Sequence, residues 1–434
     1  MTRPAAHPAR PTLAQAAAGV AGYDPRHLPV AAARALMLAL AQPVSTVEQV
    51  GLRAALGRVL AHDVVSPIDV PAHDNSAMDG YALRWADLAS TGDTTLRVAG
   101  TAMAGRPFVG TPGAGEAVRI MTGAVMPAGT DTVVVQEVAR VHDAPDGQPR
   151  VTVPAGQQAG QNTRARGEDL ARGAPALSAG RILAPADLGL LASLGAAEVA
   201  VRRRVRVAFF STGDELRSVG EPLPEGCVYD SNRYTIRAML ERSGAEPIDL
   251  GVVRDDPAAL ERAMREAADG ADAVISSGGV SVGEADHTRA LLARLGDIAA
   301  WTIAMRPGRP MAFGRLDDAL YFGLPGNPVA VMVTFLFLVR DALRAMAGAA
   351  PGGAPLTRVR SAAPLRKRPG RTEYQRAMLR RGADGALEAH LTGQQGSGVL
   401  SSMSRADCIV VLHHEQGPVA AGEWVDVLPF EGLL

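Results

Sequence analysis

Helix-like and strand-like spacing of apolar residues alternates along the chain in long blocks. The spacing over Pro29–Leu40 and over Thr46–Leu60 predicts two opening helices, with a break at Pro43 between them. From residue 63 to residue 153 the apolar runs shorten, as in Ala117–Met121, and Gly, Pro and Asp separate them. Such runs are typical of strands joined by turns, so we expect a β-rich lobe here.

The stretch after this lobe predicts a connection and then one more helix. Residues 154–174 are rich in Gly, Gln and Arg, as irregular connections often are. The pattern over Pro185–Leu194 predicts a helix, and the charged run Arg202–Arg206 marks the beginning of a third region.

Near-continuous apolar runs alternate with helical patterns in this third region, which predicts βαβ units and a mostly parallel sheet. The expected strands are Arg206–Ser211, Pro247–Val253, Ala273–Ser276, Trp301–Met305, Pro310–Phe313 and Ala319–Phe322. The expected helices contain Ile236, Met239 and Leu240, follow the capping residue Asp256, lie near Thr288–Leu295, and extend over Val329–Met346. After the Gly/Pro hinge at 349–355, short strands resume and predict a small β-barrel or sandwich.

Composition places the chain among globular proteins. With 434 residues, at about 150 per domain, about three domains are expected. The formal net charge of −1 gives no global field for nucleic acid or an anionic membrane. The most apolar helical stretch, Leu28–Ala41, is shorter than the about 18 residues that a membrane span needs. The opening MTRPAAHPARPT lacks the apolar segment of a secretion signal, so we expect a cytoplasmic protein without nucleic-acid or membrane partners.

Cysteine and histidine spacing excludes several kinds of site. Cys227 and Cys408 form no CxxC pair, and we expect both to be buried small hydrophobic residues. The nine histidines show no metal-ligand spacing, so a zinc site is not expected. No Ser–His–Asp arrangement can be argued from the sequence.

Polar loops follow the expected strands of the third region. Ligands of open parallel sheets bind outside the carboxyl ends of the strands, so these loops should meet at one edge. They are Ser211–Glu215, Arg254–Asp256, Ser276–Asp286, Arg306–Arg309 and Gly323–Pro328.

The glycine-rich part of one loop, Gly278–Gly283, is a candidate phosphate site. Its backbone N–H groups can surround an anion, because glycine has no Cβ to clash with phosphate. Asp286 stands nearby and, with Asp214, Glu215 and Asp255, would form the acidic cluster that a Mg²⁺ shared with phosphate requires. The purely structural alternatives are a tight turn, a helix cap at Asp214 and a turn residue at Asp255.

Two arginines are candidate ligands of a second anion. Arg306 and Arg309 flank Pro307-Gly308 and could direct two guanidinium forks at a tetrahedral oxyanion, or form a solvated surface pair. The turn Pro325–Pro328 leads directly into the amino end of a helix.

A second polar cluster lies in and beside the β-rich lobe. It comprises Asp74–Gly80, Thr122-Gly123, Gln136-Glu137 and Arg166–Asp169. For Asp74–Gly80 alone a capped turn is the commoner case, Thr122-Gly123 and Gln136-Glu137 are equally ambiguous, and Arg166–Asp169 could be a salt-bridged loop.

Taken together, these strings resemble the molybdopterin molybdenumtransferase family, which is related to the E domain of gephyrin. The motifs follow the family order over nearly the whole chain. They are Asp74-Asn-Ser-Ala-Met-Asp-Gly-Tyr81, Met121-Thr-Gly-Ala124, Arg166-Gly-Glu-Asp169, Ser211-Thr-Gly-Asp-Glu-Leu216, Asp230-Ser-Asn232, Ser277-Gly-Gly-Val-Ser-Val-Gly-Glu-Ala-Asp286, Pro325-Gly-Asn-Pro328 and Gln395-Gly-Ser-Gly398.

The resemblance implies a multidomain α/β and β protein with four domains. These are an elongated helical linker from residues 13–62 and 154–204, an inserted β-rich lobe at 63–153, an α/β domain with a mostly parallel sheet at 205–348, and a C-terminal β-barrel at 355–434. It also implies a homodimer with sites shared between subunits, and transient contact with the molybdopterin adenylyltransferase and downstream molybdoenzymes.

The implied reaction is molybdenum insertion into adenylyl-molybdopterin, with molybdate as the source, Mg²⁺ as the cofactor and AMP released. The residues expected to be catalytic are Asp74, Thr122, Glu215, Asp255 and Asp286, and Glu215 and Asp286 are expected to hold the metal. The residues expected to bind substrate are Asp169, Asp214, Ser277, Gly278, Gly279, Ser281, Gly283, Arg306, Arg309, Pro325, Gly326, Asn327 and Pro328.

The chain departs from its relatives around the oxyanion. Where they often have Lys…Lys-Pro-Gly-Lys, this chain has Thr302 and the two arginines, which bind oxyanions with forks. Ala330 stands where a serine is common, and backbone N–H groups at that helix start could compensate.

Two other functions remain open from the sequence. An adenylyltransferase of the preceding step would share the α/β domain and its Gly-Gly loop, and a gephyrin-like scaffold would share the whole architecture. Tungstate in place of molybdate is also open, because the two oxyanions have the same charge and nearly the same size.

Overall fold

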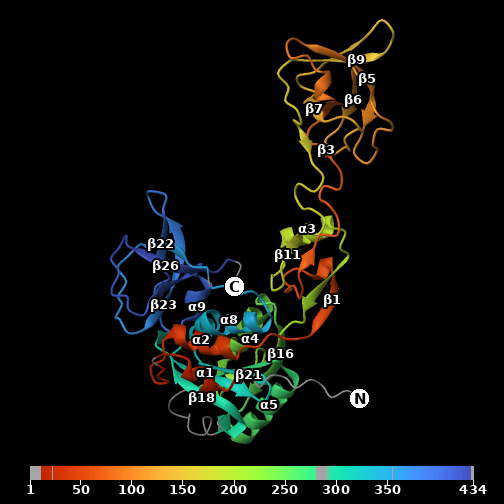
Figure 1. Cartoon of the computed structure of the whole chain (residues 1–434). Helices are drawn as coiled ribbons and strands as arrows, with labels where there is room; N and C mark the ends of the chain where they lie inside the picture. Colours follow the sequence, from red (N-terminus) through yellow and green to blue (C-terminus); the bar gives the residue numbers. More distant parts are fainter. Residues whose placement is uncertain (1–10, 22, 280–290, 293, 354, 432–434) are drawn as a thin grey trace, which may run out of the picture.

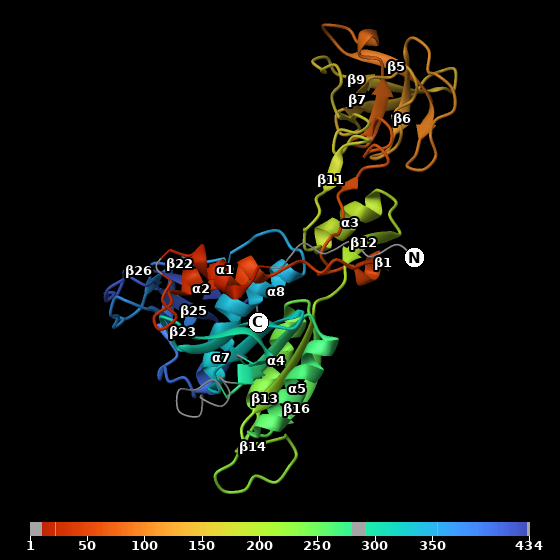
Figure 2. The same cartoon turned by 60° about the horizontal axis from the view of Figure 1, so that its bottom comes forward.

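The computed structural model describes residues 11–21, 23–279, 291–292, 294–353 and 355–431. The chain forms a V: an α/β body lies at the base, a C-terminal barrel rises on one side, and a long arm that ends in a β lobe rises on the other (Figure 1). Figure 2 shows the same separation of the lobe from the body after rotation.

The body is built on one six-stranded sheet with the order β16-β13-β17-β21-β20-β18. The first four strands of this order are parallel, and β20 and β18 run antiparallel at the end of the sheet. The strands are β13 (Arg206–Thr212), β16 (Glu246–Val253), β17 (Ala273–Ser277), β18 (Gly296–Thr302), β20 (Pro310–Leu316) and β21 (Ala319–Leu324).

Helices cover both faces of this sheet because its strands are apolar on both sides. Phe209 packs toward one core and Phe210 toward the other, as the two-residue repeat of a strand requires. The first core receives α4 (Ser231–Arg242) and the long closing helix, and the second receives α5 (Pro257–Gly270). The closing helix consists of α7 (Pro328–Thr334), a π-helical turn over Phe335–Val339 and α8 (Arg340–Met346).

The predicted α/β pattern is therefore confirmed, with shifts at strand ends. The helix capped by Asp256 begins as expected, since the Asp256 carboxylate accepts from the Ala259 N–H. The strand expected at Trp301–Met305 is instead the end of β18 followed by the short β19 (Met305–Arg306). Half of the range Thr288–Leu295, where a helix was expected, lies outside the described residues, and the described residues 291, 292, 294 and 295 are helical.

The opening helices belong to the body and not to the linker. α1 (Leu13–Ala18) and α2 (Val30–Leu40) bury their apolar side chains in the first core of the sheet; Leu36 is fully buried there, in the same core as Phe313. The expectation that the range 13–62 lies wholly in the linker is therefore wrong in its first part. The sequence pattern shows that α2 has an apolar face, but it does not show which core that face meets.

The helix expected over Thr46–Leu60 is also wrong. The chain forms β1 (Val47–Gly51) and a 3-10 turn over Leu52–Ala54, and β1 pairs antiparallel with β12 (Glu198–Arg202). β-branched residues face each other across the two strands, as in Val50 opposite Val199. This pairing with a distant strand outweighs the local helical spacing.

The arm consists of short ribbons and one helix, α3 (Pro185–Ser193), among the residues the structure describes. Its two chain segments pair as β1 with β12, β2 (Val64–Val65) with β11 (Pro175–Leu177), and β3 (Asn75–Ser76) with β10 (Thr163–Arg164). The lobe at its tip is a six-stranded sheet of β7 (Thr132–Val135), β4 (Gly80–Leu83), β6 (Glu116–Ile120), β5 (Thr94–Ala102), β9 (Pro149–Val153) and β8 (Arg140–Asp143).

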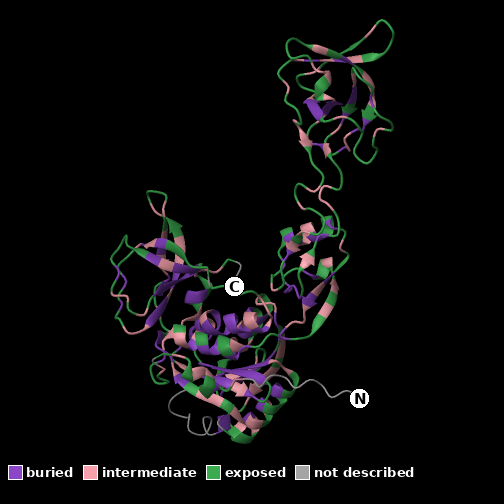
Figure 3. Cartoon of the chain, viewed as in Figure 1, coloured by how far each residue is buried: buried purple, intermediate pink, exposed green. Residues whose placement is uncertain are grey.

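The C-terminal domain is a closed barrel, because β23 pairs with both β24 and β25. Its strands are β22 (Thr357–Ser361), β23 (Thr372–Arg381), β24 (Leu387–Leu391), β25 (Cys408–Leu412) and β26 (Trp424–Pro429), with α9 (Leu400–Ser404) between two of them. β19 of the body pairs parallel with β23 and so joins the two domains. Figure 3 shows buried residues in the body and the barrel and, in smaller cores, in the arm and the lobe.

The burial expected for the two cysteines is confirmed for one and wrong for the other. Cys408 is buried, as expected, and this burial raises the pKa of its thiol to about 12. Cys227 is only half-buried, so the same expectation for it is wrong. In the described part of the chain, no helix is long and apolar enough to cross a membrane.

The place of α2 gives a stability prediction. Leu36→Ala should lower the free energy of unfolding of the body by about 2–5 kcal/mol, because it leaves a cavity in the first core. Leu38→Ala, on the same helix but 37% exposed, should change it by at most about 0.5 kcal/mol. Hydrogen exchange of the β20 and β21 amides measures the difference. Faster exchange confined to β1 and β12 would instead place α2 in the linker.

Candidate functional site

The carboxyl ends of the parallel strands meet at one edge of the sheet, as the sequence predicted. At the end of β13 the Thr212 hydroxyl donates to the Asp255 carboxylate, which follows β16. The Asp255 N–H in turn lies 3.4 Å from Oδ1 of Asp214. Asp214, Glu215 and Asp255 are all exposed, so this corner presents negative charge to solvent.

The backbone at Gly278 lies so close to the Thr212 carbonyl that only glycine fits there. Gly278 has φ +96°, and a Cβ there would lie 2.4 Å from the Thr212 carbonyl oxygen. Its N–H donates to the Leu324 carbonyl at 3.2 Å, which joins the end of β17 to the end of β21. Gly279 also has a positive φ, +67°. The glycines therefore allow the ends of β13, β17 and β21 to lie close together at the start of the candidate phosphate loop.

Asn232 fixes this arrangement, and the sequence analysis did not assign it a role. Its Nδ2 donates to Oγ of Ser277 at 2.9 Å and to the Gly326 carbonyl at 2.7 Å. It thus ties the Gly-Gly loop to the Pro325–Pro328 turn from the first turn of α4. Its position in the Asp230-Ser-Asn232 motif was the available signal. Oδ1 of Asn232 is buried without a hydrogen-bond partner in the structure.

Part of the expected site lies outside the described residues, namely Ser281, Gly283 and Asp286. Among the described residues, no three His, Cys, Asp or Glu side chains come together as a metal site. Asp214, Glu215 and Asp255 therefore do not form a cation site by themselves.

Arg306 and Arg309 line a strongly cationic pocket of about 540 Å³ between the body and the barrel. Both are exposed, and neither has an ion pair with another described residue. The loop that carries them is pressed onto α7: a Cβ at Gly308 would lie 2.5 Å from Oγ1 of Thr334. The pocket's other basic residues come from the barrel and are Arg366, Lys367, Arg368 and Arg371.

Two of these barrel cations are already engaged. Arg371 pairs with Glu373 at 2.9 Å. Nζ of Lys367 donates to three backbone carbonyls, those of Arg368, His414 and Gln416, and burial lowers the pKa of Lys367. The exposed arginines are thus the groups free to bind an anion, and a pocket holding four such forks is a favourable place for an oxyanion.

A barrel loop reaches the start of α7 beside this pocket. The Val329 N–H donates to the Ser397 carbonyl at 3.0 Å, so this N–H at the helix start is not available to an oxyanion. Ala330 is buried and supplies no hydroxyl group. The Val329 N–H therefore cannot replace the serine hydroxyl that is missing at position 330, as the sequence analysis expected of backbone N–H groups at this helix start.

Arg376 holds that loop, and the sequence analysis missed it. It is fully buried, and its guanidinium donates to the carbonyls of Gln394, Gln395 and Gly396 and to Oγ of Ser402. The groups that accept from Arg376 come together only when the barrel folds, so the sequence pattern gave no direct signal of this role.

The second cluster lies at the base of the β lobe, where the chain crosses between arm and lobe. Oδ1 of Asp74 accepts from the Arg166 N–H at 2.6 Å, which joins two motifs that are far apart in sequence. The Asp169 N–H donates to the Val70 carbonyl at 3.1 Å. Asp74 and Asp169 are both exposed here.

Thr122 belongs to this cluster, but its hydroxyl already donates a hydrogen bond to Asp79. Both its N–H and its Oγ1 donate to Oδ1 of Asp79 at 2.7 Å, and these bonds lower the pKa of the Asp79 carboxyl. Thr122 therefore positions Asp79, a residue that the sequence analysis quoted in a motif but did not select.

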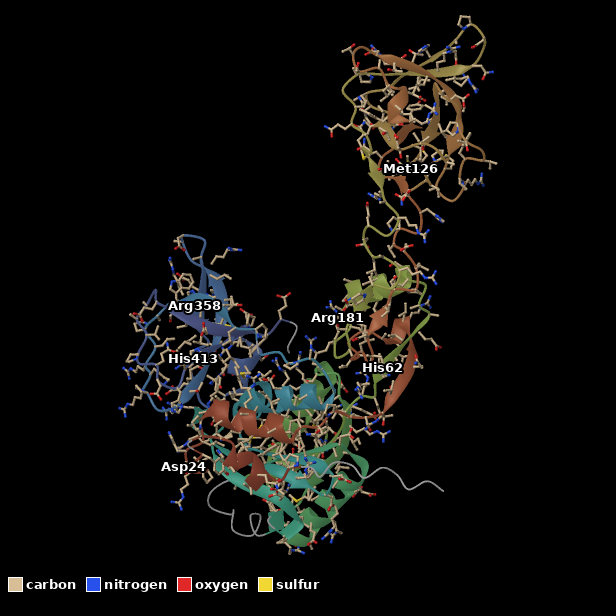
Figure 4. The ribbon with its side chains drawn as sticks, viewed as in Figure 1. Asp24, His62, Met126, Arg181, Arg358 and His413 are labelled. Atoms are coloured by element: carbon tan, nitrogen blue, oxygen red, sulfur yellow. The ribbon has the colours of Figure 1, made fainter. Side chains whose placement is uncertain are left out.

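Within one chain the two clusters lie apart. Figure 4 labels Met126, whose N–H donates to the Asp74 carbonyl, at the base of the lobe, with His62 and Arg181 of the arm between it and the body. The strand-end edge lies in the body at the other end of that arm (Figure 1).

Comparisons with known families cover almost the whole chain. Residues 28–195 match the MoeA N-terminal region (domains I and II), residues 208–345 match a probable molybdopterin binding domain, and residues 358–430 match the MoeA C-terminal region (domain IV).

Individual relatives agree with these matches. A molybdopterin molybdenumtransferase of Haemophilus influenzae is 44% identical over 93% of this chain and 98% of its own length. One from Nostoc is 40% identical over 88% of each chain. The crystal structure of a molybdopterin biosynthesis MoeA protein from Pyrococcus horikoshii superposes with a TM-score of 0.79 at 28% identity, over 93% of this chain and 99% of that one. The chain therefore belongs to the MoeA family of molybdopterin molybdenumtransferases.

Proposed function

We propose that this chain inserts molybdenum from molybdate into adenylyl-molybdopterin and releases AMP. The observation that carries the proposal is the strand-end edge, where the glycine loop and the arginine pocket occupy one side of the sheet. β21 and β20 lie between them, and neighbouring strands are about 4.8 Å apart. One substrate can therefore reach both with its phosphates and its dithiolene sulfurs.

Each part of the edge has a role that follows from its chemistry. The backbone of the loop that begins at Gly278 binds the pyrophosphate, and Asn232 keeps that loop against the Pro325–Pro328 turn. Arg306 and Arg309 hold molybdate beside the sulfurs and stabilise its charge. Two bonds from molybdenum to the dithiolene sulfurs replace two molybdenum–oxygen bonds of molybdate, and the displaced oxygens leave as water with the thiol protons. A further water molecule cleaves the phosphoanhydride, so that AMP leaves and the pterin keeps its phosphate.

We also propose that Mg²⁺ serves this site, with Glu215 and Asp286 as its ligands. Support comes from charge: the exposed carboxylates at this corner repel a pyrophosphate unless a cation lies between them. Bound there, the cation would supply charge neutralisation to the phosphates.

The active form, we further propose, is a homodimer in which the lobe cluster of one subunit completes the edge of the other. The arm holds Asp74, Asp79 and Thr122 away from their own strand-end edge, so a second copy is the natural source of the missing half. Transient contacts with the enzyme that makes the adenylyl ester and with molybdoenzymes would deliver substrate and remove product.

Incubation with purified adenylyl-molybdopterin, molybdate and Mg²⁺ tests the activity, with AMP followed by chromatography. AMP release should depend on both molybdate and Mg²⁺, and chelation should stop it. ATP-dependent formation of the adenylyl ester would support the enzyme of the preceding step instead. Absence of either turnover would favour a scaffold. Replacing molybdate by tungstate in the same assay shows which oxyanion is preferred.

The arginine pocket gives a second prediction. Arg306→Ala or Arg309→Ala should weaken apparent molybdate affinity about ten- to a hundred-fold, because each change removes charge-assisted hydrogen bonds of about 1.5–3 kcal/mol. Arg306→Lys should lose less, since the charge stays and only the fork is lost. Arg53→Ala, an exposed linker residue, is the control. Loss of pterin binding with unchanged molybdate dependence would assign these arginines to phosphate.

The shared site gives a third prediction. Asp74→Asn and Glu215→Gln subunits should each be inactive alone, yet random mixing should restore about a quarter of wild-type activity, because half of the dimers then carry one intact site. Mixing Glu215→Gln with Asp214→Asn should restore nothing, since both changes fall on the same cluster. Heterodimers of the first pair that form and stay inactive would contradict the shared site.

A further inference from the structure

A second cationic crevice lies at the joint between the arm and the body, away from the strand-end edge. It has a volume of about 360 Å³ and is lined by residues 56–59 and Ile182 of the arm, by 202–204, and by the ends of α4 and α8. β13 begins and α4 ends here, so the crevice is at the opposite edge of the sheet from the proposed catalytic site. Among its described lining residues Glu241 is the only carboxylate, against seven arginines: Arg58, Arg202, Arg203, Arg204, Arg242, Arg340 and Arg344.

Carboxylates outside the crevice neutralise only some of these arginines. Arg58 pairs with Glu48, and Arg203 makes two bonds to Asp272, at 2.8 and 3.0 Å. The one lining carboxylate, Glu241, is itself engaged by an exposed arginine of α4 at 3.0 Å.

Four arginines of the crevice have no carboxylate among the described residues. Arg202 and Arg204 donate to backbone carbonyls, which hold the side chains but leave their charge uncompensated. Arg242 and Arg344 stand in the last turns of α4 and α8. Each of these helix ends offsets only about half a charge, so the crevice stays positive.

Arg340 provides the second observation, because its donors are buried and unused. Only 6% of the residue is exposed, and its Nε and Nη1 have no hydrogen-bond partner in the structure. Nη2 lies 3.4 Å from Asp341, but that carboxylate also binds Arg34, at 2.6 Å. Arg344 follows one helical turn later, so two like charges are stacked on one helix face. Buried donors without acceptors are rare in folded proteins, so the position of Arg340 favours an acceptor bound in the crevice.

We propose that this crevice binds a small polyvalent oxyanion of the phosphate class. Such an anion supplies the acceptors that Arg340 lacks and the charge that Arg242 and Arg344 lack, and guanidinium forks match its geometry. The crevice, at about 360 Å³, is large enough for phosphate or pyrophosphate. Because the lining residues come from both the arm and the body, the bound anion connects the two and stiffens the joint.

The test uses the full-length protein with two arginines of the other cationic pocket removed, Arg306→Ala/Arg309→Ala, so that this pocket contributes less to the signal. Titration calorimetry with inorganic pyrophosphate, at constant ionic strength and without Mg²⁺, should show one site per chain, because the exposed carboxylates beside the glycine loop repel pyrophosphate when no cation lies between them. Arg242→Ala/Arg344→Ala in that background should weaken it about ten-fold or more. Arg262→Ala, an exposed arginine of α5, is the matched control and should change nothing.

A second variant checks the buried arginine. Arg340→Met should abolish the pyrophosphate-dependent rise in melting temperature, while in phosphate-free buffer the protein should melt no lower than the parent, because the unused donors are gone. AMP in place of pyrophosphate shows whether a nucleotide phosphate also fits. Equal pyrophosphate binding by the Arg242→Ala/Arg344→Ala variant would overturn the proposal, as would no binding to the parent.

One outcome identifies a different occupant. If Arg242→Ala/Arg344→Ala dissociates the dimer and leaves pyrophosphate binding unchanged, these arginines meet carboxylates of a second copy, and the oxyanion proposal falls. The molybdate dependence of AMP release in otherwise wild-type protein is measured separately, so the proposed activity and this site fail independently.

Discussion

The close approach of the backbone at Gly278 to the Thr212 carbonyl is the constraint on which the candidate site depends. A side chain there would push apart the ends of β13 and β17, and with them the hydrogen bond from Gly278 to Leu324 on β21. Asn232 then closes the same junction from α4, with one amide group serving two loops. The polar edge is thus a consequence of how tightly the parallel strands pack, and the loops lie together because their strands do.

The sequence predicted this part of the molecule well because its signals are local. Apolar runs, the Asp256 cap and glycines at strand ends each act within a few residues, and the α/β pattern and the edge followed from them. The two largest failures are non-local. The residues of β1 have helical spacing but pair with β12, which lies about a third of the chain away, and α2 presents an apolar face without indicating which core it meets.

The sequence analysis missed two functional side chains because their roles also depend on contacts between residues far apart in sequence. Asp79 gains its role from Thr122 on another strand connection, and Arg376 gains its role from carbonyls that surround it only in the closed barrel. A motif shows that such a residue is present, but the partner decides whether it positions, binds or only packs. Ser281, Gly283 and Asp286 stay predictions, since they fall outside the described residues.

Net charge conceals the distribution that matters for anion chemistry here. The chain carries a formal charge of −1, yet six Arg and Lys residues line the pocket beside β19 and seven arginines line the crevice at the arm. Like charges held this close repel one another by an amount that rises as water is excluded, so each concentration destabilises the fold unless an anion or a carboxylate opposes it. At the strand-end edge the acidic corner lies at the ends of β13 and β16 and the arginine pocket beside β19, so the two groups of opposite charge do not cancel each other, as the proposed binding of phosphate and oxyanion at one edge requires. At the joint the described walls hold a single carboxylate, Glu241, which already pairs with Arg237, so the proposed anion would supply the remaining compensation.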